Sequence, residues 1–243
     1  MPTAKLLAVP ASHACAVAEA MLDAKRVPYR RVDLFPGLSR AWLRLTGFDG
    51  VTVPALRIDS RRIQGSRAIA RALDDRWPDP PLFPADPAQR QRTEEIETWG
   101  DGPLQMTARR IILWALCHSS EGRAAALQGA RLQFHFPTRL AAPLGPPIVR
   151  LDAALNGANT AATRADLHAL PHLLDQADHW ITQGDLARTP PTAADYQVAA
   201  SVRILLTSDD LRPLLARRPV AQLAHQLIPN LPGHLPAGVL PIS

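Results

Sequence analysis

The first 75 residues alternate short apolar runs with stretches in which apolar residues recur at helical spacing. Four strands are predicted, at Leu6–Val9, Val27–Leu34, Val51–Ile58 and Arg61–Ile63. Helices are predicted to begin after Ser12, at Ser39 and near Ser66. The order strand, helix, strand, helix, strand, strand, helix requires one mixed sheet with helices on its faces.

The pattern changes after Trp77. Five prolines between residues 78 and 87 predict an extended, semi-rigid linker, because proline lacks an N–H and restricts the residue before it. Beyond the linker the spacing is helical, with a kink expected at 100–103 and clear helices at 167–181 and 196–206. Four prolines after Ile228 predict an extended tail. We therefore predict an α/β domain over 1–79 and an all-helical domain with this tail over 88–243.

Composition and charge narrow the class of protein. Of the 243 residues, 47% are hydrophobic and 20% charged, which excludes a disordered chain. The net charge is +5, and all basic residues except Lys5 and Lys25 are arginine. The arginines come as scattered pairs and not as a block of like charge, which argues against a nucleic-acid-binding protein.

The number of cysteines and the hydropathy of the chain indicate in which cell compartment the protein is expected. Cys15 and Cys117 cannot build a disulfide framework in a chain of this length. The apolar run Leu6–Val9 is stopped by Pro10 and is too short for a secretory signal, and no run is long enough to span a membrane. We expect a soluble, cytoplasmic protein that does not bind membranes.

The first candidate for chemistry is Ser12-His13-Ala14-Cys15, between the first strand and the first helix. Unpaired N–H groups and the helix dipole stabilise a thiolate at such a position. The simpler interpretation is an N-cap serine followed by a small buried cysteine. The four residues alone favour the simpler one.

Three further motifs have both a structural and a functional interpretation. Val53-Pro54 is either an ordinary trans proline at a strand entry or a cis turn whose exposed backbone pairs with an extended ligand. Gly65-Ser66 is either a helix cap alone or a carboxylate site at a helix N-terminus. Thr192 and Asp195 form a structural capping box.

A row of polar residues in the predicted helix at 167–181 has metal-ligand spacing. It consists of His168, His172, Asp175 and His179. These side chains lie opposite the apolar face of the helix, so we expect them in solvent and predict no metal site.

Taken together, these motifs resemble the glutathione S-transferase superfamily along nearly the whole chain. The resemblance rests on Ser12 after the first strand, the Val53-Pro54 turn, Gly65-Ser66, the Pro-Asp-Pro-Pro linker and Thr192-x-x-Asp195. It is greatest to bacterial members with a Ser-His-x-Cys start. It implies a thioredoxin-like first domain, a helical-bundle second domain and a homodimer.

The resemblance also implies roles for single residues. Ser12 falls at the family's catalytic position, and Cys15 at the second cysteine of thioredoxin-like relatives. Val53, next to a cis Pro54, would hold the cysteinyl part of glutathione, and Ser66 the γ-glutamyl carboxylate. Gly65 departs from the family's Glu or Gln, so the co-substrate is either glutathione, bound weakly, or another low-molecular-weight thiol.

Three functions remain open on this basis. The first is an enzyme that activates a thiol for addition to a small electrophile. The others are a non-catalytic ligand-binding or scaffold protein on the same fold, and a thiol-dependent isomerase or reductase that uses Cys15. The electrophile pocket of the first is predicted to be lined by His13, Trp99, Met106, Arg110 and Trp114.

Overall fold

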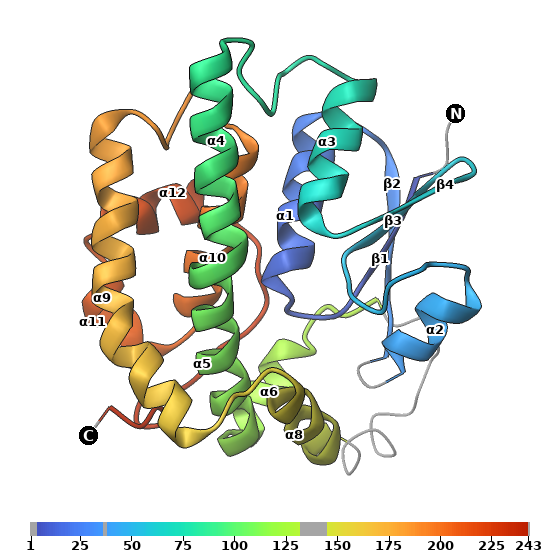
Figure 1. Cartoon of the computed structure of the whole chain (residues 1–243). Coiled ribbons are helices and arrows are strands. Elements are labelled where there is room, and N and C mark those ends of the chain that lie inside the picture. The colour runs from blue at the N-terminus through green and yellow to red at the C-terminus, as the bar shows by residue number, and fades with distance from the viewer. Residues whose placement is uncertain (1–3, 36–37, 132–144, 243) are drawn as a thin grey trace.

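The computed structural model describes residues 4–35, 38–131 and 145–242 (Figure 1). Its first part has the predicted order of elements: β1 (Ala4–Ala8), α1 (His13–Ala24), β2 (Tyr29–Asp33), α2 (Ser39–Leu45), β3 (Ala55–Ile58), β4 (Arg61–Gln64) and α3 (Ser66–Arg76). The strands form one sheet in the order β2-β1-β3-β4. Strand β1 is parallel to β2 and antiparallel to β3, so the sheet is mixed and thioredoxin-like.

The side chains of β1 alternate between two apolar layers, one on each face of the sheet. Leu6 belongs to the large core shared with α1 and α3, whereas Leu7 belongs to a smaller cluster with Leu43 of α2. Successive side chains of a strand point to opposite faces, so α1 and α3 cover one face of the sheet and α2 covers the other. The large core continues into the helical part of the chain, toward which α1 and α3 face in Figure 1.

The second part is helical. No ladder of strands occurs after β4 in the described residues, where only an isolated bridge joins Ser208 and Leu235. The elements are α4 (Pro87–Trp99), the π-helix η1 (Gly100–Leu104), α5 (Gln105–His118), α6 (Ser120–Ala126), α8 (Gly145–Leu155), α9 (Thr160–Gln183), α10 (Ala193–Leu205), the 3₁₀-helix η3 (Asp209–Leu211), α11 (Arg212–Leu215) and α12 (Pro219–Leu227). None of the described helices is long and apolar enough to cross a membrane.

Helix α10 is the centre of this part, because nearly all of its side chains are buried. It begins at the predicted capping box, in which the Thr192 N–H donates to Asp195 Oδ2 at 2.7 Å. Asp195 also accepts a hydrogen bond from the Ala187 N–H at 2.6 Å. The buried carboxylate therefore fixes both the start of α10 and the loop before it.

The linker is anchored by a buried lysine. Lys25, at the end of α1, is 5% exposed, and its ammonium donates to Asp74 Oδ1 at 2.8 Å, the Trp77 carbonyl at 2.5 Å and the Pro80 carbonyl at 2.6 Å. All three ammonium hydrogens thus have acceptors. The stretch between α3 and α4 is thereby held against the first domain.

Several predicted bounds differ from the observed ones. Residues 51–54 precede β3 and are not part of it. Helix α9 begins seven residues before the predicted start, at Thr160, and includes Pro171. The expected kink at 100–103 is the π-helix η1. The predicted extended tail is free of helix over residues 228–242. The prolines between 137 and 147 predict a second extended connection, which lies mostly outside the described residues, but 146 and 147 are inside α8.

Candidate functional site

Strand register brings two of the predicted motifs to one end of the sheet. Leu7 of β1 pairs with Ala55, and Ala55 pairs with Gln64 of β4. The residues just before β3 therefore lie beside those just after β1, because these two strands are antiparallel. The Gly65 N–H donates to the Pro54 carbonyl at 2.9 Å, and the Val53-Pro54 bond is cis. Val53-Pro54 and Gly65-Ser66 thus meet at the end of the sheet where the chain leaves β1 for Ser12.

Ser12 is the N-cap of α1. Its backbone is extended, with φ −84° and ψ 114°, and its Oγ accepts a hydrogen bond from the Cys15 N–H at 3.3 Å. The capping bond uses a lone pair of the oxygen and leaves the hydroxyl hydrogen available to a second partner. Ser12 is half-buried, so that partner can be a ligand.

Cys15 occupies the first turn of the same helix but is 0% exposed. Burial raises the pKa of its thiol to about 11. The hydrogen bond with Ser12 and the charge of Arg31 lower this pKa, but by less than burial raises it. The thiolate is therefore scarce at neutral pH, and the sulfur cannot be reached from solvent.

His13 is also buried, at 4% exposure. Burial, and then the charge of Arg109, lowers the pKa of its imidazole to about 3. It hydrogen bonds to the backbone of Gln105, and its Nε2 finds no partner among the described residues. His13 is thus a neutral contact between α1 and α5.

The loop before Val53 is fixed by Gln64. The Gln64 side chain accepts a hydrogen bond from the Gly50 N–H at 2.9 Å and donates one to the Thr52 carbonyl at 2.6 Å. Its amide is therefore engaged within the first domain. The adjacent Gly65 has φ +88° and ψ 144°, a region that only glycine adopts readily, and a Cβ there would point into open space.

Ser66 is engaged by the helical domain. It is 4% exposed, and its hydroxyl donates to Gln197 Oε1 of α10 at 3.0 Å. Gln197 Nε2 in turn donates to Gln105 Oε1 at 3.2 Å and to Asp101 Oδ1 at 3.5 Å. The predicted carboxylate site is therefore joined to a polar network that crosses between the two domains.

Three of the predicted pocket residues make their contacts with α9. Arg110 forms a bidentate pair with Asp166, with both N···O distances at 2.6 Å. Trp114 Nε1 donates to Thr160 Oγ1 at 3.3 Å. Trp99 packs edge-on against Trp180, with ring centroids 4.7 Å apart. The described contacts place these three side chains at the α9 interface; Met106 contacts Arg109 instead.

Arg109 is a residue of this site that the sequence analysis missed. Its Nη1 lies 3.7 Å from the sulfur of Met106, and its charge acts on His13, in the first turn of α1. Burial lowers the pKa of its guanidinium, while the charges of Asp152 and Asp101 act in the opposite direction. The pair Arg109-Arg110 is visible in the sequence, but which of the two faces the first domain depends on how α5 is rotated.

The row of polar residues on α9 is exposed as predicted: His168, His172, Asp175 and His179 all face solvent. Asp175 Oδ1 accepts a hydrogen bond from Arg218 at 2.7 Å. Within residues 4–35, 38–131 and 145–242, no three His, Cys, Asp or Glu side chains are placed to hold a metal ion.

The comparisons with known proteins agree with the fold. A family model described as the glutathione S-transferase N-terminal domain matches residues 6–81. No curated protein sequence gives a significant match.

Solved structures resemble nearly the whole chain. Glutathione transferase F2 from Populus trichocarpa is 16% identical, with a TM-score of 0.64 and coverage of 93% of each chain. The theta class glutathione S-transferase from Xanthomonas axonopodis pv. citri, with glutathione bound, is 16% identical, with a TM-score of 0.59 and coverage of 95% of this chain and 99% of that one. FzlA from C. crescentus is 18% identical, with a TM-score of 0.59 and coverage of 93% and 87%. At such identities the likeness shows the fold.

The fold is thus a thioredoxin-like domain followed by a helical domain, with a polar site where the first strand meets its helix. Residues 6–81 match the glutathione S-transferase N-terminal domain family, and the chain as a whole has the fold of the glutathione S-transferases.

Proposed function

We propose that the chain is a glutathione S-transferase-like enzyme that activates a low-molecular-weight thiol for reaction with a small electrophile. The observation that supports this most is the grouping of Val53-Pro54 and Gly65-Ser66 at the sheet end from which β1 leads to Ser12. A hydroxyl, a stretch of backbone outside the ladder and a helix N-terminus are what an extended thiol ligand needs.

In the proposed reaction, Ser12 donates its free hydroxyl hydrogen to the sulfur of the bound thiol. This hydrogen bond favours the charged form and lowers the pKa of the thiol, whose proton passes to water. The thiolate then attacks the electrophile, so a carbon–sulfur bond forms and the electrophile releases its leaving group or takes up a proton. Backbone groups of Val53 hold the ligand in register during the attack.

The groups around Ser66 support a proposal about which thiol binds. Gly65 offers no side chain to an ammonium group, and the neighbouring Gln64 amide is bonded to Gly50 and Thr52. The Ser66 hydroxyl is bonded to Gln197. We therefore propose that glutathione binds weakly and that a thiol without a γ-glutamyl group is a better co-substrate. A lost charge-assisted hydrogen bond weakens binding by about one to two orders of magnitude.

For the electrophile we propose the side of α5 that carries Met106 and Arg109. Arg109 lies near the start of α1, whereas Trp99, Arg110 and Trp114 are engaged by α9. A guanidinium near the thiolate would also stabilise negative charge that develops on the electrophile. Cys15 has no part in this proposal, because it is fully buried and its pKa is raised.

A second candidate is a non-catalytic ligand-binding protein on the same fold. The Ser66–Gln197 hydrogen bond favours it, because a hydroxyl committed to the neighbouring domain is less available to a ligand. For either function we propose a homodimer, which light scattering at micromolar concentration tests.

The test uses two variants that separate capping from chemistry. Ser12→Asn keeps a side chain that caps α1 but removes the hydroxyl, whereas Ser12→Thr keeps both. With a panel of cellular thiols and an aryl halide, we expect turnover to fall by roughly 10²–10³-fold in Ser12→Asn and to be largely retained in Ser12→Thr. Ser60→Ala, in the exposed β3–β4 turn, is the control.

The outcomes distinguish the three functions. Equal turnover in wild type and Ser12→Asn contradicts the proposed role of Ser12. Saturable thiol binding by calorimetry without turnover favours the non-catalytic protein. A disulfide-exchange activity that is lost in Cys15→Ser supports an isomerase or reductase.

A further inference from the structure

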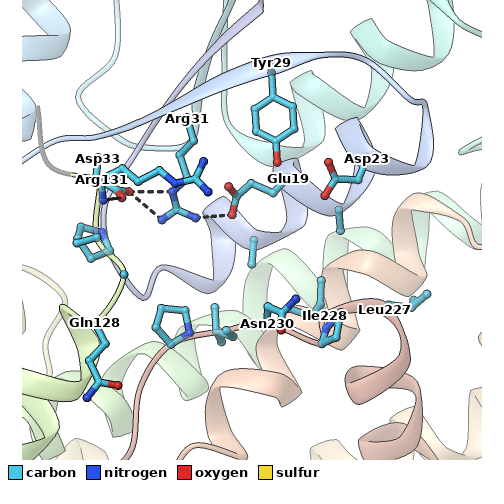
Figure 2. Close-up of a pocket in the computed structure, with 18 residues that line it drawn as sticks. Glu19, Asp23, Tyr29, Arg31, Asp33, Gln128, Arg131, Leu227, Ile228 and Asn230 are labelled. Atoms are coloured by element: carbon cyan, nitrogen blue, oxygen red, sulfur yellow. Dashed lines mark hydrogen bonds and ion pairs between the residues drawn. The ribbon is translucent and has the colours of Figure 1, made fainter.

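A cavity of about 640 Å³ borders α1, and its lining includes Pro10 and Ala16, on either side of Ser12 in the sequence. One wall is formed by α1 and β2, and the other by the tail after α12 together with residues 128–131 (Figure 2). Neither Ser12, Val53 nor Ser66 lines it. The cavity therefore needs an explanation of its own.

One end of the cavity is closed by a saturated ion-pair cluster. Arg31 donates from Nε and Nη2 to Asp33 Oδ1, at 2.9 and 2.8 Å, and from Nη1 to Glu19. The other oxygen of Asp33 accepts a hydrogen bond from the Arg131 N–H at 2.7 Å. Arg31 and Asp33 are thus fully engaged, and they position Glu19.

Next to this cluster, the wall formed by α1 carries negative charge in excess. Glu19 and Asp23 are four residues apart on α1, so their carboxylates share one face, where like charges repel. Tyr29 hydrogen bonds to Asp23, and Figure 2 shows its hydroxyl directed toward both carboxylates. The lining contains three carboxylates, of Glu19, Asp23 and Asp33, but only the two guanidinium groups of Arg31 and Arg131, and Arg31 is paired with Asp33 and Glu19.

The facing wall is of a different kind. Leu227, Ile228 and Pro229 present apolar groups, and Asn230 adds an amide that faces α1 in Figure 2. An occupant that satisfies both walls has a cationic head between the carboxylates and an apolar body against the tail. Burial raises the pKa of both carboxyl groups because it destabilises their charged forms. A cation bound between them would stabilise the charged forms again.

We propose that this cavity binds a small organic cation, an amine with an apolar chain, whose ammonium group lies between Glu19 and Asp23. The site is independent of the thiol chemistry proposed for Ser12. Its occupant would join α1 to the C-terminal tail.

The probe is n-hexylamine, with 1-hexanol and hexanoate as ligands of the same length but different charge. Calorimetry at neutral pH and low salt is expected to show saturable binding of hexylamine, about tenfold or more tighter than that of 1-hexanol, and none of hexanoate. Equal affinity for hexylamine and hexanol, or the absence of saturable binding, overturns the proposal.

Two variants locate the site. Asp23→Asn keeps a partner for Tyr29 and is expected to weaken hexylamine binding about three- to fivefold. Asp75→Asn removes an exposed carboxylate of α3 and is expected to change nothing. Ala20→Leu, which adds bulk to the lining of the cavity, is expected to abolish binding. Unchanged binding in both Asp23→Asn and Ala20→Leu, with thermal melting showing that both are folded, assigns the amine to another place and rejects the site.

Discussion

The hydroxyl of Ser66 donates a hydrogen bond to Oε1 of Gln197 across 131 positions of sequence, from the first turn of α3 to the middle of α10. This 3.0 Å contact ties the N-terminus of a helix in the thioredoxin-like domain to the most buried helix of the other domain. The residue that the family resemblance assigns to the ligand is therefore also part of the domain interface.

Replacing Gln197 tests how much this hydrogen-bond network contributes to the stability of the fold. Gln197→Leu removes the acceptor of the Ser66 hydroxyl and the donor to Gln105 Oε1 in a buried region, so the free energy of unfolding should fall by about 1–3 kcal/mol. Urea denaturation measures it. Gln222→Leu, on the exposed side of α12, serves as the control and should change the midpoint little. An unchanged midpoint in Gln197→Leu means that the network adds no net stability.

Gln64 should affect ligand binding through the loop that it holds. Gln64→Ala removes the bonds to Gly50 and Thr52, so the backbone at Val53 is less well fixed. We expect the KM for the preferred thiol to rise several-fold while kcat changes less, because the loop positions the ligand but donates nothing to the sulfur. Steady-state kinetics decide. A fall in kcat with KM unchanged contradicts this role.

We expect the stability of the first domain to depend strongly on Lys25. Lys25→Met keeps the length of the side chain but removes its ammonium group. Two carbonyls then lose their donor, and Asp74 loses its ion pair but keeps the hydrogen bond from the Leu82 N–H. Removing one partner of a buried pair costs about 3–5 kcal/mol. Thermal and urea unfolding measure the loss. Lys5→Met, the matched change at the half-buried lysine of β1, should cost much less.

His13 should make the protein sensitive to acid. Its pKa is about 3 in the folded chain and 6.5 when unfolded, so below pH 6.5 the unfolded chain binds the additional proton. The stability that the neutral imidazole contributes is present above pH 6.5 and is lost as pH falls toward 3. The slope is about 1.4 kcal/mol per pH unit, or roughly 2 kcal/mol between pH 7 and pH 5.

Urea titrations at several pH values test this slope. His13→Asn should flatten the dependence of stability on pH over this range, whereas His168→Asn, at an exposed position of α9, should leave it as in the wild type. Parallel slopes in wild type and His13→Asn would show that another group carries the acid sensitivity.

Local patterns predicted most of the fold. The helix at 39–45, the cap at Ser12 and the capping box at Thr192 depend on residues close together in the sequence, and the structure has all three. The helical spacing predicted a helix that starts at 167. Instead, α9 starts at Thr160 under the cap of Asn159, and Pro171 lies in its interior, where packing outweighs the missing hydrogen bond.

The site was less predictable because its details are not local. Gly65 is visible as a departure from the family, but its φ of +88° is not, and at this angle any other residue adds backbone strain. Adjacent residues on a helix point about 100° apart, so periodicity alone could not choose between Arg109 and Arg110. The contact between Ser66 and Gln197 depends on how the domains dock.

Because the Lys25 amine is enclosed by the linker, its chemical reactivity reports how often the linker detaches. The chain has only two side-chain amines, and that of Lys25 is covered by the three acceptors around it. An acylating reagent can reach it only when Trp77 and Pro80 move away. The acylation rate of Lys25, followed by mass spectrometry with Lys5 as internal reference, therefore measures how often the linker detaches in the native protein.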